Sequence, residues 1–101
     1  MKRDEVLSVL GLARRANKTV TGFDSISKQA REGNVSLILL AKDCSETTKQ
    51  SYLNKCRFYQ IPCEEYGTVE TIGKSVGKNN IAAIAVCDKG FAALLYKKMR
   101  G

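Results

Sequence analysis

The chain has 101 residues, 44% hydrophobic and 27% charged, which is the profile of one folded domain over residues 1–101. Its longest apolar runs, Leu37 to Ala41 and Ile81 to Cys87, are far shorter than the roughly 20 residues that a membrane-spanning helix needs. Acidic residues and an amphipathic pattern stand at the start, where a secretory signal would have an apolar stretch. We therefore expect a cytoplasmic protein with no membrane contact.

Positive charge is concentrated at the two ends of the chain. Seventeen Lys and Arg against ten Asp and Glu give a net charge of +7 and a pI near 9.4. Residues 1–31 hold seven basic and three acidic residues, for a net charge of +4. Residues 32–73 hold four basic and six acidic residues (−2), and residues 74–101 hold six basic residues and one acidic residue (+5). This uneven distribution favours a face directed to a polyanion. The alternative is charge that only keeps the protein in solution.

The first part of the chain predicts two helices with a strand after each. Helical spacing of apolar residues predicts a helix over about 4–16, with a stripe formed by Val6, Val9, Leu10, Ala13 and Ala16. Residues 19–21 are β-prone and end at Gly22. Helical spacing then resumes with Phe23, Ile26 and Ala30 as far as Gly33. Residues 35–41 are almost all apolar, which predicts a strand covered on both faces.

The middle of the chain continues with a helix, a weaker strand and a short helix. Asp43 and Ser45 are good N-cap residues for a helix over about 45–58, whose one side carries Tyr52, Cys56 and Tyr59. Residues 61–66 predict a strand, and Pro62 favours an edge position or a strand start. The short helix that follows begins at a capping threonine and carries three apolar residues: Thr68, then Val69, Ile72 and Val76.

The last part predicts a loop, a buried strand and a final helix. Residues 78–80 are polar, and residues 81–87 are apolar. Asp88 can cap the last helix, in which Phe91, Leu94 and Leu95 are expected to point inward. The order is thus a helix followed by four strand–helix units. Such alternation predicts an α/β domain with a central sheet sandwiched between helices.

Metal binding and catalysis have little support in the residue types. The cysteines, with 11, 6 and 23 residues between them, form no closely spaced pair, and there is no histidine: Cys44, Cys56, Cys63 and Cys87. Cys63 and Cys87 lie in apolar runs and are expected to be free thiols of the core. Cys44 beside Lys42 is the single candidate nucleophile. Glycine-rich phosphate-binding motifs are absent. We expect no enzyme, metal or cofactor.

The turn after the first strand is the most promising contact point. Ligands of an open sheet gather beyond the carboxyl ends of its strands, which brings Gly22 together with Lys42. The free backbone N–H groups after Gly22 can bind an anion, and the next turn adds polar groups: Asp24, Ser25 and Lys28. The alternative is ordinary capping by Asp24 and a solvated Lys28.

Four segments together resemble a known family. They are residues 11–16 (Gly-Leu-Ala-Arg-Arg-Ala), 20–28 (Val-Thr-Gly to Lys), 73–78 (Gly-Lys-Ser-Val-Gly-Lys) and 86–91 (Val-Cys-Asp-Lys-Gly-Phe). They are similar to the bacterial YlxQ-type proteins, which belong to the kink-turn RNA-binding family of the archaeal ribosomal protein L-seven-Ae. The match covers nearly the whole chain.

The resemblance implies a fold, a partner and a site. The fold is a three-layer α-β-α sandwich around a small mixed sheet of about four strands. The partner is structured RNA of kink-turn type, in which tandem sheared G·A pairs follow a bulge, or ribosomal RNA. The contacts come from the turn Gly22 to Lys28 and the loop Gly77 to Ala82. With the lysines near these segments, the expected RNA-binding residues are Gly22, Phe23, Asp24, Ser25, Lys28, Lys42, Lys74, Lys78, Asn79, Asn80 and Ile81.

The turn departs from the family pattern at two positions. Many ribosomal relatives carry Gly-x-Asn-Glu-x-x-Lys there; Gly22 and Lys28 match, but Asp24 replaces the asparagine and Ser25 the glutamate. An ionised aspartate only accepts hydrogen bonds and repels phosphate, and serine reaches less far than glutamate. Lys28 can still donate to a guanine edge. The departures predict weaker kink-turn binding or a different RNA motif.

Our leading hypothesis is a monomeric, non-enzymatic, ribosome-associated RNA-binding protein. A second hypothesis is a protein-interaction adaptor that retains the fold with a weakened RNA site, which the two replaced residues and the acidic middle segment favour. An enzyme that uses Cys44 is the third.

Overall fold

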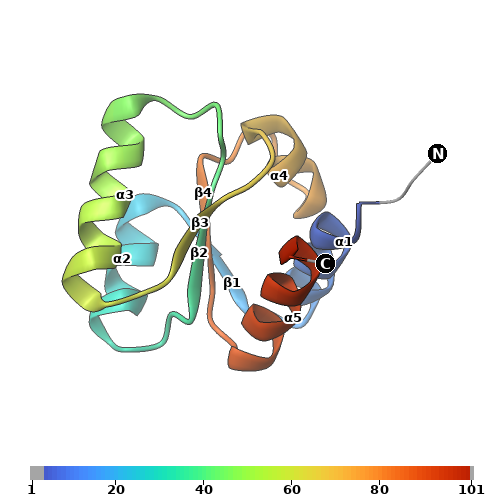
Figure 1. Ribbon diagram of the computed structural model, residues 1–101, viewed down its shortest axis with the longest axis horizontal. Helices are drawn as coiled ribbons and strands as arrows, with labels where there is room; N and C mark the ends of the chain where they lie inside the picture. Colours follow the sequence, from blue (N-terminus) through green and yellow to red (C-terminus); the bar gives the residue numbers. More distant parts are fainter. Residues whose placement is uncertain (1–3, 101) are drawn as a thin grey trace.

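The computed structural model describes residues 4–100 and has the predicted order of elements (Figure 1). A helix is followed by four strand–helix units, as the periodicity predicts. The elements are α1 (Glu5–Arg15), β1 (Thr19–Thr21), α2 (Phe23–Arg31), β2 (Leu37–Leu40), α3 (Glu46–Tyr59), β3 (Cys63–Glu65), α4 (Val69–Ser75), β4 (Ala83–Val86) and α5 (Lys89–Arg100).

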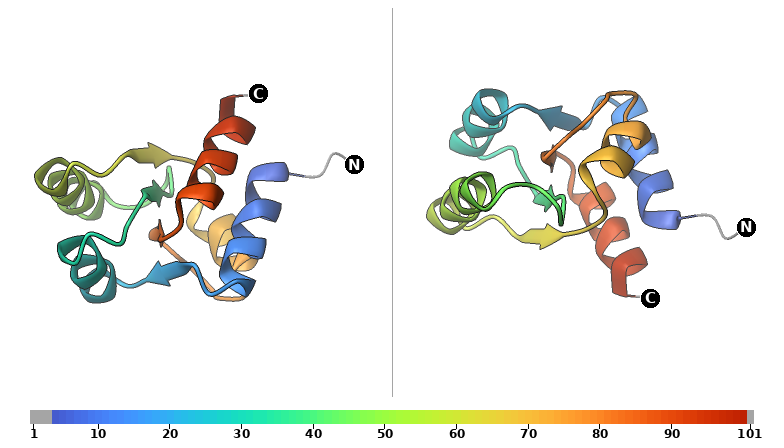
Figure 2. Two further views of the ribbon diagram at one scale, coloured as in Figure 1. Left: turned by 90° about the horizontal axis from the view of Figure 1, so that it is seen from below. Right: turned by 90° about the horizontal axis from the view of Figure 1, so that it is seen from above.

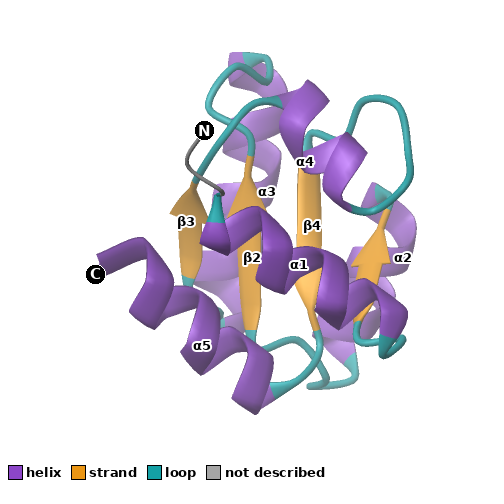
Figure 3. Ribbon diagram, turned by 90° about the vertical axis from the view of Figure 1, so that its right-hand side faces the viewer, coloured by secondary structure: helices purple, strands orange, loops and turns teal. Residues whose placement is uncertain are grey.

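The four strands form one mixed sheet in the order β1-β4-β2-β3. β4 is antiparallel to both of its neighbours, whereas β2 and β3 are parallel. The register pairs Thr21 with Ile84 and Leu40 with Ala83. The ends of β1, β2 and β3 and the start of β4 therefore lie along one edge of the sheet, which we call the carboxyl edge. In Figure 3 it is the upper edge, toward α4.

Helices cover both faces of the sheet, which confirms the three-layer sandwich. α1, α4 and α5 lie on one face and α2 and α3 on the other (Figures 1 and 2). All residues of β2 and β4 are buried, as their apolar runs predict. On the first face the core contains Leu10, Leu37, Leu39, Ile72, Ile84 and Leu95; on the second it contains Ile26, Ile38, Leu40, Tyr52, Cys56 and Ala85.

Side-chain caps begin α1, α3, α4 and α5. The N–H of Thr48 donates to Ser45 (3.2 Å), that of Thr71 to Thr68 (3.1 Å) and that of Phe91 to Asp88 (2.9 Å), as predicted. Asp43 acts elsewhere: its carboxylate accepts a hydrogen bond from the Val69 N–H of α4 at 2.8 Å. The structure therefore corrects the cap position, because Ser45 alone meets the first turn of α3 and Asp43 bridges to the next helix.

Four residues that the sequence predicts to face the core are exposed or only half-buried. Leu94 is 36% exposed, because it stands about 100° around the helix from the buried Leu95. Ala16 is exposed, since α1 has already ended at Arg15. Cys63 and Cys87 are only half-buried, because β3 is an edge strand and Cys87 lies past the end of β4. Cys56 on α3 is the cysteine that is buried in the core.

Candidate nucleic-acid interface

The turn between β1 and α2 leaves the start of α2 without a side-chain cap. Gly22 has φ +92°, a left-handed conformation that glycine adopts freely, and no atom crowds the place of a Cβ. Asp24 and Ser25 are exposed, and neither caps the helix. The capping role that was the alternative for Asp24 is therefore absent. The first N–H groups of α2 have no acceptor within the helix and can donate to a ligand.

The loop between α4 and β4 is folded tightly onto the end of α4. The N–H of Lys78 donates to the Gly73 carbonyl at 2.8 Å, and the N–H of Ile81 donates to the Val69 carbonyl at 3.0 Å. A Cβ at Gly73 would lie only 2.1 Å from the carbonyl oxygen of Asn79. The loop can hold this course only because residue 73 has no side chain.

The predicted residues of this loop differ in exposure. Lys78, Asn79 and Asn80 are exposed, so their polar groups are available to a ligand. The side chain of Ile81 is half-buried and packs against the core below α1 and α4. Ile81 thus anchors the loop, while the three residues before it face solvent.

The sheet brings the turn and the loop to the same edge. β1 pairs with β4, and Thr21, just before the turn, stands opposite Ile84. Lys42 follows β2 at this edge, where the N–H of Ala41 donates to the carbonyl of Ala82 at 2.8 Å. Lys28 is exposed one turn into α2. The turn, the loop and Lys42 thus gather at the carboxyl edge, as expected from the strand ends.

Lys74 lies apart from this group. It lines a hollow of about 320 Å³ between α1 and α4, together with Asp4, Leu7, Ser8, Thr71 and Ser75. That hollow is on the face of the sheet opposite α2. None of the other predicted residues lines this hollow.

Lys28, Lys42 and Lys78 are not neutralised by ion pairs within the described residues, although Lys49 at the same edge is. Within residues 4–100 the ion pairs are Lys49–Glu65 (3.1 Å) and Lys98–Glu5 (3.0 Å), and neither includes Lys28, Lys42 or Lys78. The nearby carboxylate of Asp43 accepts a hydrogen bond from the α4 backbone. Unpaired ammonium groups beside free backbone N–H groups form a surface that can accept a polyanion.

Arg14 joins this surface although the spacing argument did not select it. A hollow of about 310 Å³ lies between α1, β1 and the α4–β4 loop, and its lining contains no carboxylate: Arg14, Asn17, Thr19, Thr21, Val76 and Lys78. The guanidinium of Arg14 lies beside Gly77, 3.7 Å from the place of a Cβ. A guanidinium and an ammonium over a polar hollow can bind a phosphate. The usable sequence signal was the Arg14-Arg15 pair, which stands off the apolar stripe of α1.

Phe23, at the first position of α2, is exposed to 45%. Its ring meets that of Tyr52 edge to face at 5.2 Å, and the ammonium of Lys55 lies 5.0 Å from its centroid. These contacts fix the ring at the border between the turn and α3.

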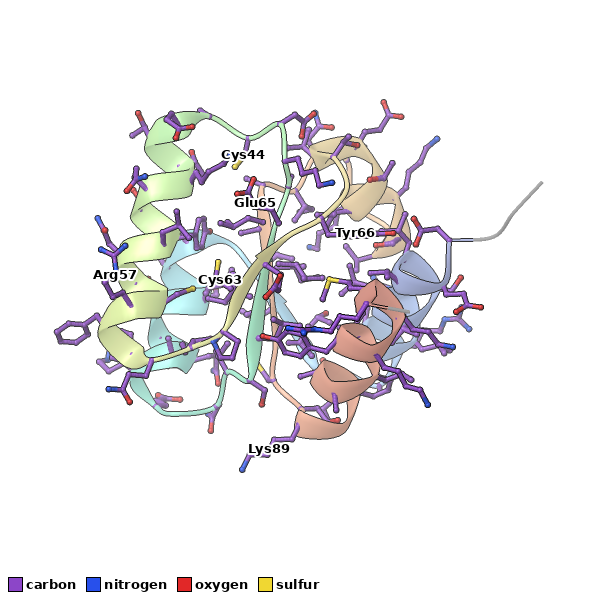
Figure 4. The ribbon with its side chains drawn as sticks, in the orientation of Figure 1. Cys44, Arg57, Cys63, Glu65, Tyr66 and Lys89 are labelled. Atoms are coloured by element: carbon purple, nitrogen blue, oxygen red, sulfur yellow. The ribbon has the colours of Figure 1, made fainter. Side chains whose placement is uncertain are left out.

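The cysteine whose pKa is lowered is closed off from solvent: the hydrogen bond with Cys63 lowers the pKa of the Cys56 thiol, but Cys56 is buried in the core. Cys44 is half-buried and packs against the core, and the neighbouring Asp43 is engaged with Val69. Cys63 lies toward α3, on the opposite side of β3 from Tyr66 (Figure 4), and shares a hydrogen bond with Cys56; that bond and burial raise the pKa of the Cys63 thiol. Among the described residues no cluster of metal-ligating side chains occurs. No helix in that part of the chain is long and apolar enough to cross a membrane.

The protein is a small α-β-α domain that presents one turn and one loop at the carboxyl edge of a mixed sheet, together with Lys28, Lys42 and Lys78. The chain belongs to the Ribosomal protein L7Ae/L30e/S12e/Gadd45 family, whose sequence profile matches residues 4–96. The resemblance seen in the motifs is thereby confirmed.

Two relatives share the length as well as the sequence. The RNA-binding protein YlxQ of Bacillus subtilis is 38% identical over 88 residues, which cover 87% of this chain and 88% of that protein. The RNA-binding protein YlxQ of Enterococcus faecium is 31% identical over 90 residues, which cover 89% and 86%.

Solved structures agree on the fold. A protein of unknown function from Bacillus halodurans has a TM-score of 0.92 at 35% identity, covering 98% of this chain and all of that one. The 15.5kD RNA binding protein of Giardia lamblia has a TM-score of 0.76 at 13% identity, covering 99% and 89%. At that low identity the second likeness concerns the fold alone.

Proposed function

We propose that residues 1–101 form a single, monomeric, non-enzymatic RNA-binding domain that recognises structured RNA of kink-turn type. One observation carries the proposal: the uncapped start of α2 and the α4–β4 loop meet at the carboxyl edge with the unpaired cations Lys28, Lys42 and Lys78. The family and the names of the two YlxQ relatives support the same partner. The RNA is ribosomal or another structured cytoplasmic RNA.

Each part of the surface has a distinct chemical task. The N–H groups after Gly22 donate to phosphate or base oxygens. Lys28 donates to the two acceptors of a guanine edge. Lys78, Asn79 and Asn80 reach phosphates and unpaired base edges from the other side. The RNA is thus held between two segments of one rigid sheet edge.

Asp24 and Ser25 lower the expected affinity for RNA. Both are exposed in the first turn of α2 and make no capping contact, so they face any bound RNA. The carboxylate of Asp24 repels phosphate and cannot donate to a base. We infer that the affinity depends more on the cations and on the α4–β4 loop than in relatives with asparagine and glutamate here.

The deciding experiment is filter binding with a kink-turn RNA and a control in which the sheared G·A pairs are replaced by Watson–Crick pairs. We expect tighter binding to the kink-turn. We also expect the logarithm of the association constant to fall linearly with the logarithm of the salt concentration, with a slope of roughly 0.7–0.9 for each phosphate that a cation neutralises. Equal affinity for both RNAs would remove the kink-turn from the proposal, and negligible binding to both would remove RNA.

The second candidate is a protein-interaction adaptor that retains the fold. The exposed Asp24 in the turn favours it, since a carboxylate there opposes RNA. Capture from lysate with and without ribonuclease separates the two functions. An adaptor keeps its protein partners after RNA digestion, whereas an RNA-binding protein loses them.

A further inference from the structure

An aromatic and basic surface lies on α3 beside the turn. A hollow of about 530 Å³ is lined by Phe23, Ser51, Asn54, Lys55, Phe58 and Tyr59. Phe58 is 78% exposed. In the described part of the chain the other exposed large apolar side chains are Leu12 and Leu94, on α1 and α5, and Phe23. Both exposed aromatic rings therefore line this one hollow, which we call the aromatic platform.

The platform is held in place by contacts among its own residues. The ammonium of Lys55 lies 5.0 Å from the centroid of Phe23 and 5.7 Å from that of Tyr59. The rings of Phe58 and Tyr59 meet edge to face at 4.9 Å and 86°. Phe23 meets Tyr52, a buried residue, in the same way. Rings fixed in this manner lose little conformational freedom when a flat ligand stacks on them.

The charge and polarity of the platform select the ligand. No carboxylate lines it, and Lys55 takes part in neither ion pair of residues 4–100. Asn54 adds an exposed amide to the lining, and the exposed Ser51 hydroxyl, which donates to the Thr47 carbonyl at 3.0 Å, can still accept a hydrogen bond. A nucleotide has a π face, polar base edges and a negative phosphate, so it matches all three features. A purely apolar protein surface would leave the Lys55 ammonium and the Asn54 amide without hydrogen-bond partners.

The platform is continuous with the proposed RNA site. Phe23 follows Gly22 directly, so the ring that borders the platform also begins the helix whose free N–H groups face the RNA. We propose that a single-stranded RNA segment flanking the structured motif runs from the turn onto the aromatic platform and stacks on Phe58. This inference rests on the proposed function, because the structured RNA delivers the strand to α3.

The test compares RNAs with and without a single-stranded extension. Filter binding compares three RNAs: a kink-turn RNA with blunt ends, the same RNA with a short single-stranded pyrimidine extension at one end, and the same RNA with that extension at the other end. We expect an extension at one end to raise affinity 5-fold or more, since stacking of one base contributes roughly 1–3 kcal/mol. Phe58→Ala should abolish this gain and leave blunt-end binding unchanged, because Phe58 is too exposed for its loss to disturb the core.

Two further variants sharpen the result. Phe58→Trp should retain the gain, and because the chain has no tryptophan its emission reports the platform alone. Stacking of a base should quench that emission. Leu12→Ala, which removes an exposed apolar side chain on the other face, should behave as the unchanged protein.

The outcomes separate this inference from the proposed function. If the kink-turn is not bound, a single-stranded pyrimidine oligonucleotide that quenches Phe58→Trp still supports the platform. Absence of quenching by any RNA, or an extension effect that survives Phe58→Ala, overturns it. If Phe58→Ala instead abolishes self-association in sedimentation while RNA binding is unaltered, the platform is a protein interface and the inference is wrong.

Discussion

Replacing Gly73 with alanine should displace the α4–β4 loop while the domain stays folded. The new Cβ would lie 2.1 Å from the carbonyl oxygen of Asn79 and 3.0 Å from that of Lys78. Real Cβ atoms almost never lie closer than 3.0 Å to another heavy atom. The backbone at Asn79 must therefore move by about 0.9 Å to relieve the 2.1 Å contact. Because the contact is with backbone, no side chain can relieve it by turning away.

The energies of this change can be divided between folding and binding. Overpacking costs about 1–3 kcal/mol. Alanine offsets up to about 1 kcal/mol of this through its higher helix propensity. A 0.9 Å shift takes one or two hydrogen bonds from Lys78, Asn79 or Asn80 out of range, at about 0.5–1.5 kcal/mol each. We therefore expect the protein to remain folded and RNA binding to weaken by about 0.5–3 kcal/mol, which is roughly 2- to 150-fold.

Filter binding and urea unfolding of the same preparation measure the two effects. Gly33→Ala is the matched control: its φ of +78° strains an alanine, but no atom lies within 4 Å of the new Cβ, and it lies beyond the far end of α2. It should lower stability and leave RNA binding alone. Unchanged binding by a folded Gly73→Ala would show that the loop does not contact RNA. Equal weakening by both variants would show that binding only follows stability.

Three further predictions follow from the surface and from the titration of one tyrosine. Lys28→Ala should weaken kink-turn binding by roughly 1–3 kcal/mol if its ammonium contacts a base edge, whereas Lys74→Ala, on the opposite face, should change it little; equal effects in filter binding would contradict the placement of the site. Arg14→Ala should weaken binding to every RNA alike, and it should lower the slope of log K against log salt concentration by roughly 0.7–0.9, the contribution of one neutralised phosphate. An unchanged slope would show that the hollow beside Arg14 binds no phosphate. Burial, and next the hydrogen bond that Tyr66 donates to Asp4, raise the pKa of Tyr66 to about 12, so its stabilising effect is complete below pH about 10 and is lost between about 10 and 12. Burial also raises the pKa values of Tyr52 and Tyr96, so absorbance titration should show several late-ionising phenols, of which Tyr66→Phe removes one. A late phase that Tyr66→Phe leaves unchanged would refute this.

Features that depend on neighbours along the chain were predictable. Ser45, Thr68 and Asp88 cap the helices expected of them, because a cap joins residues only three apart. Apolar periodicity located the elements, and the continuous runs of β2 and β4 indicated strands buried on both faces. Leu94 shows the limit of this reasoning. Apolar spacing marks the inner side of a helix, but it does not say how much of that side the packed elements will cover, and α5 buries Leu95 while leaving Leu94 exposed.

The sequence by itself determined the turn at Gly22, the helix that follows and the excess of positive charge, since these depend on residue type and short spacing. Only the tertiary structure decided which charges act together. Pairing of β1 with β4 sets the loop beside a turn more than fifty residues earlier, and Arg14 enters through packing against that loop. Lys74 instead lines a different hollow, between α1 and α4. Sheet order and close backbone contacts have no local signature, because residues distant in the chain create them.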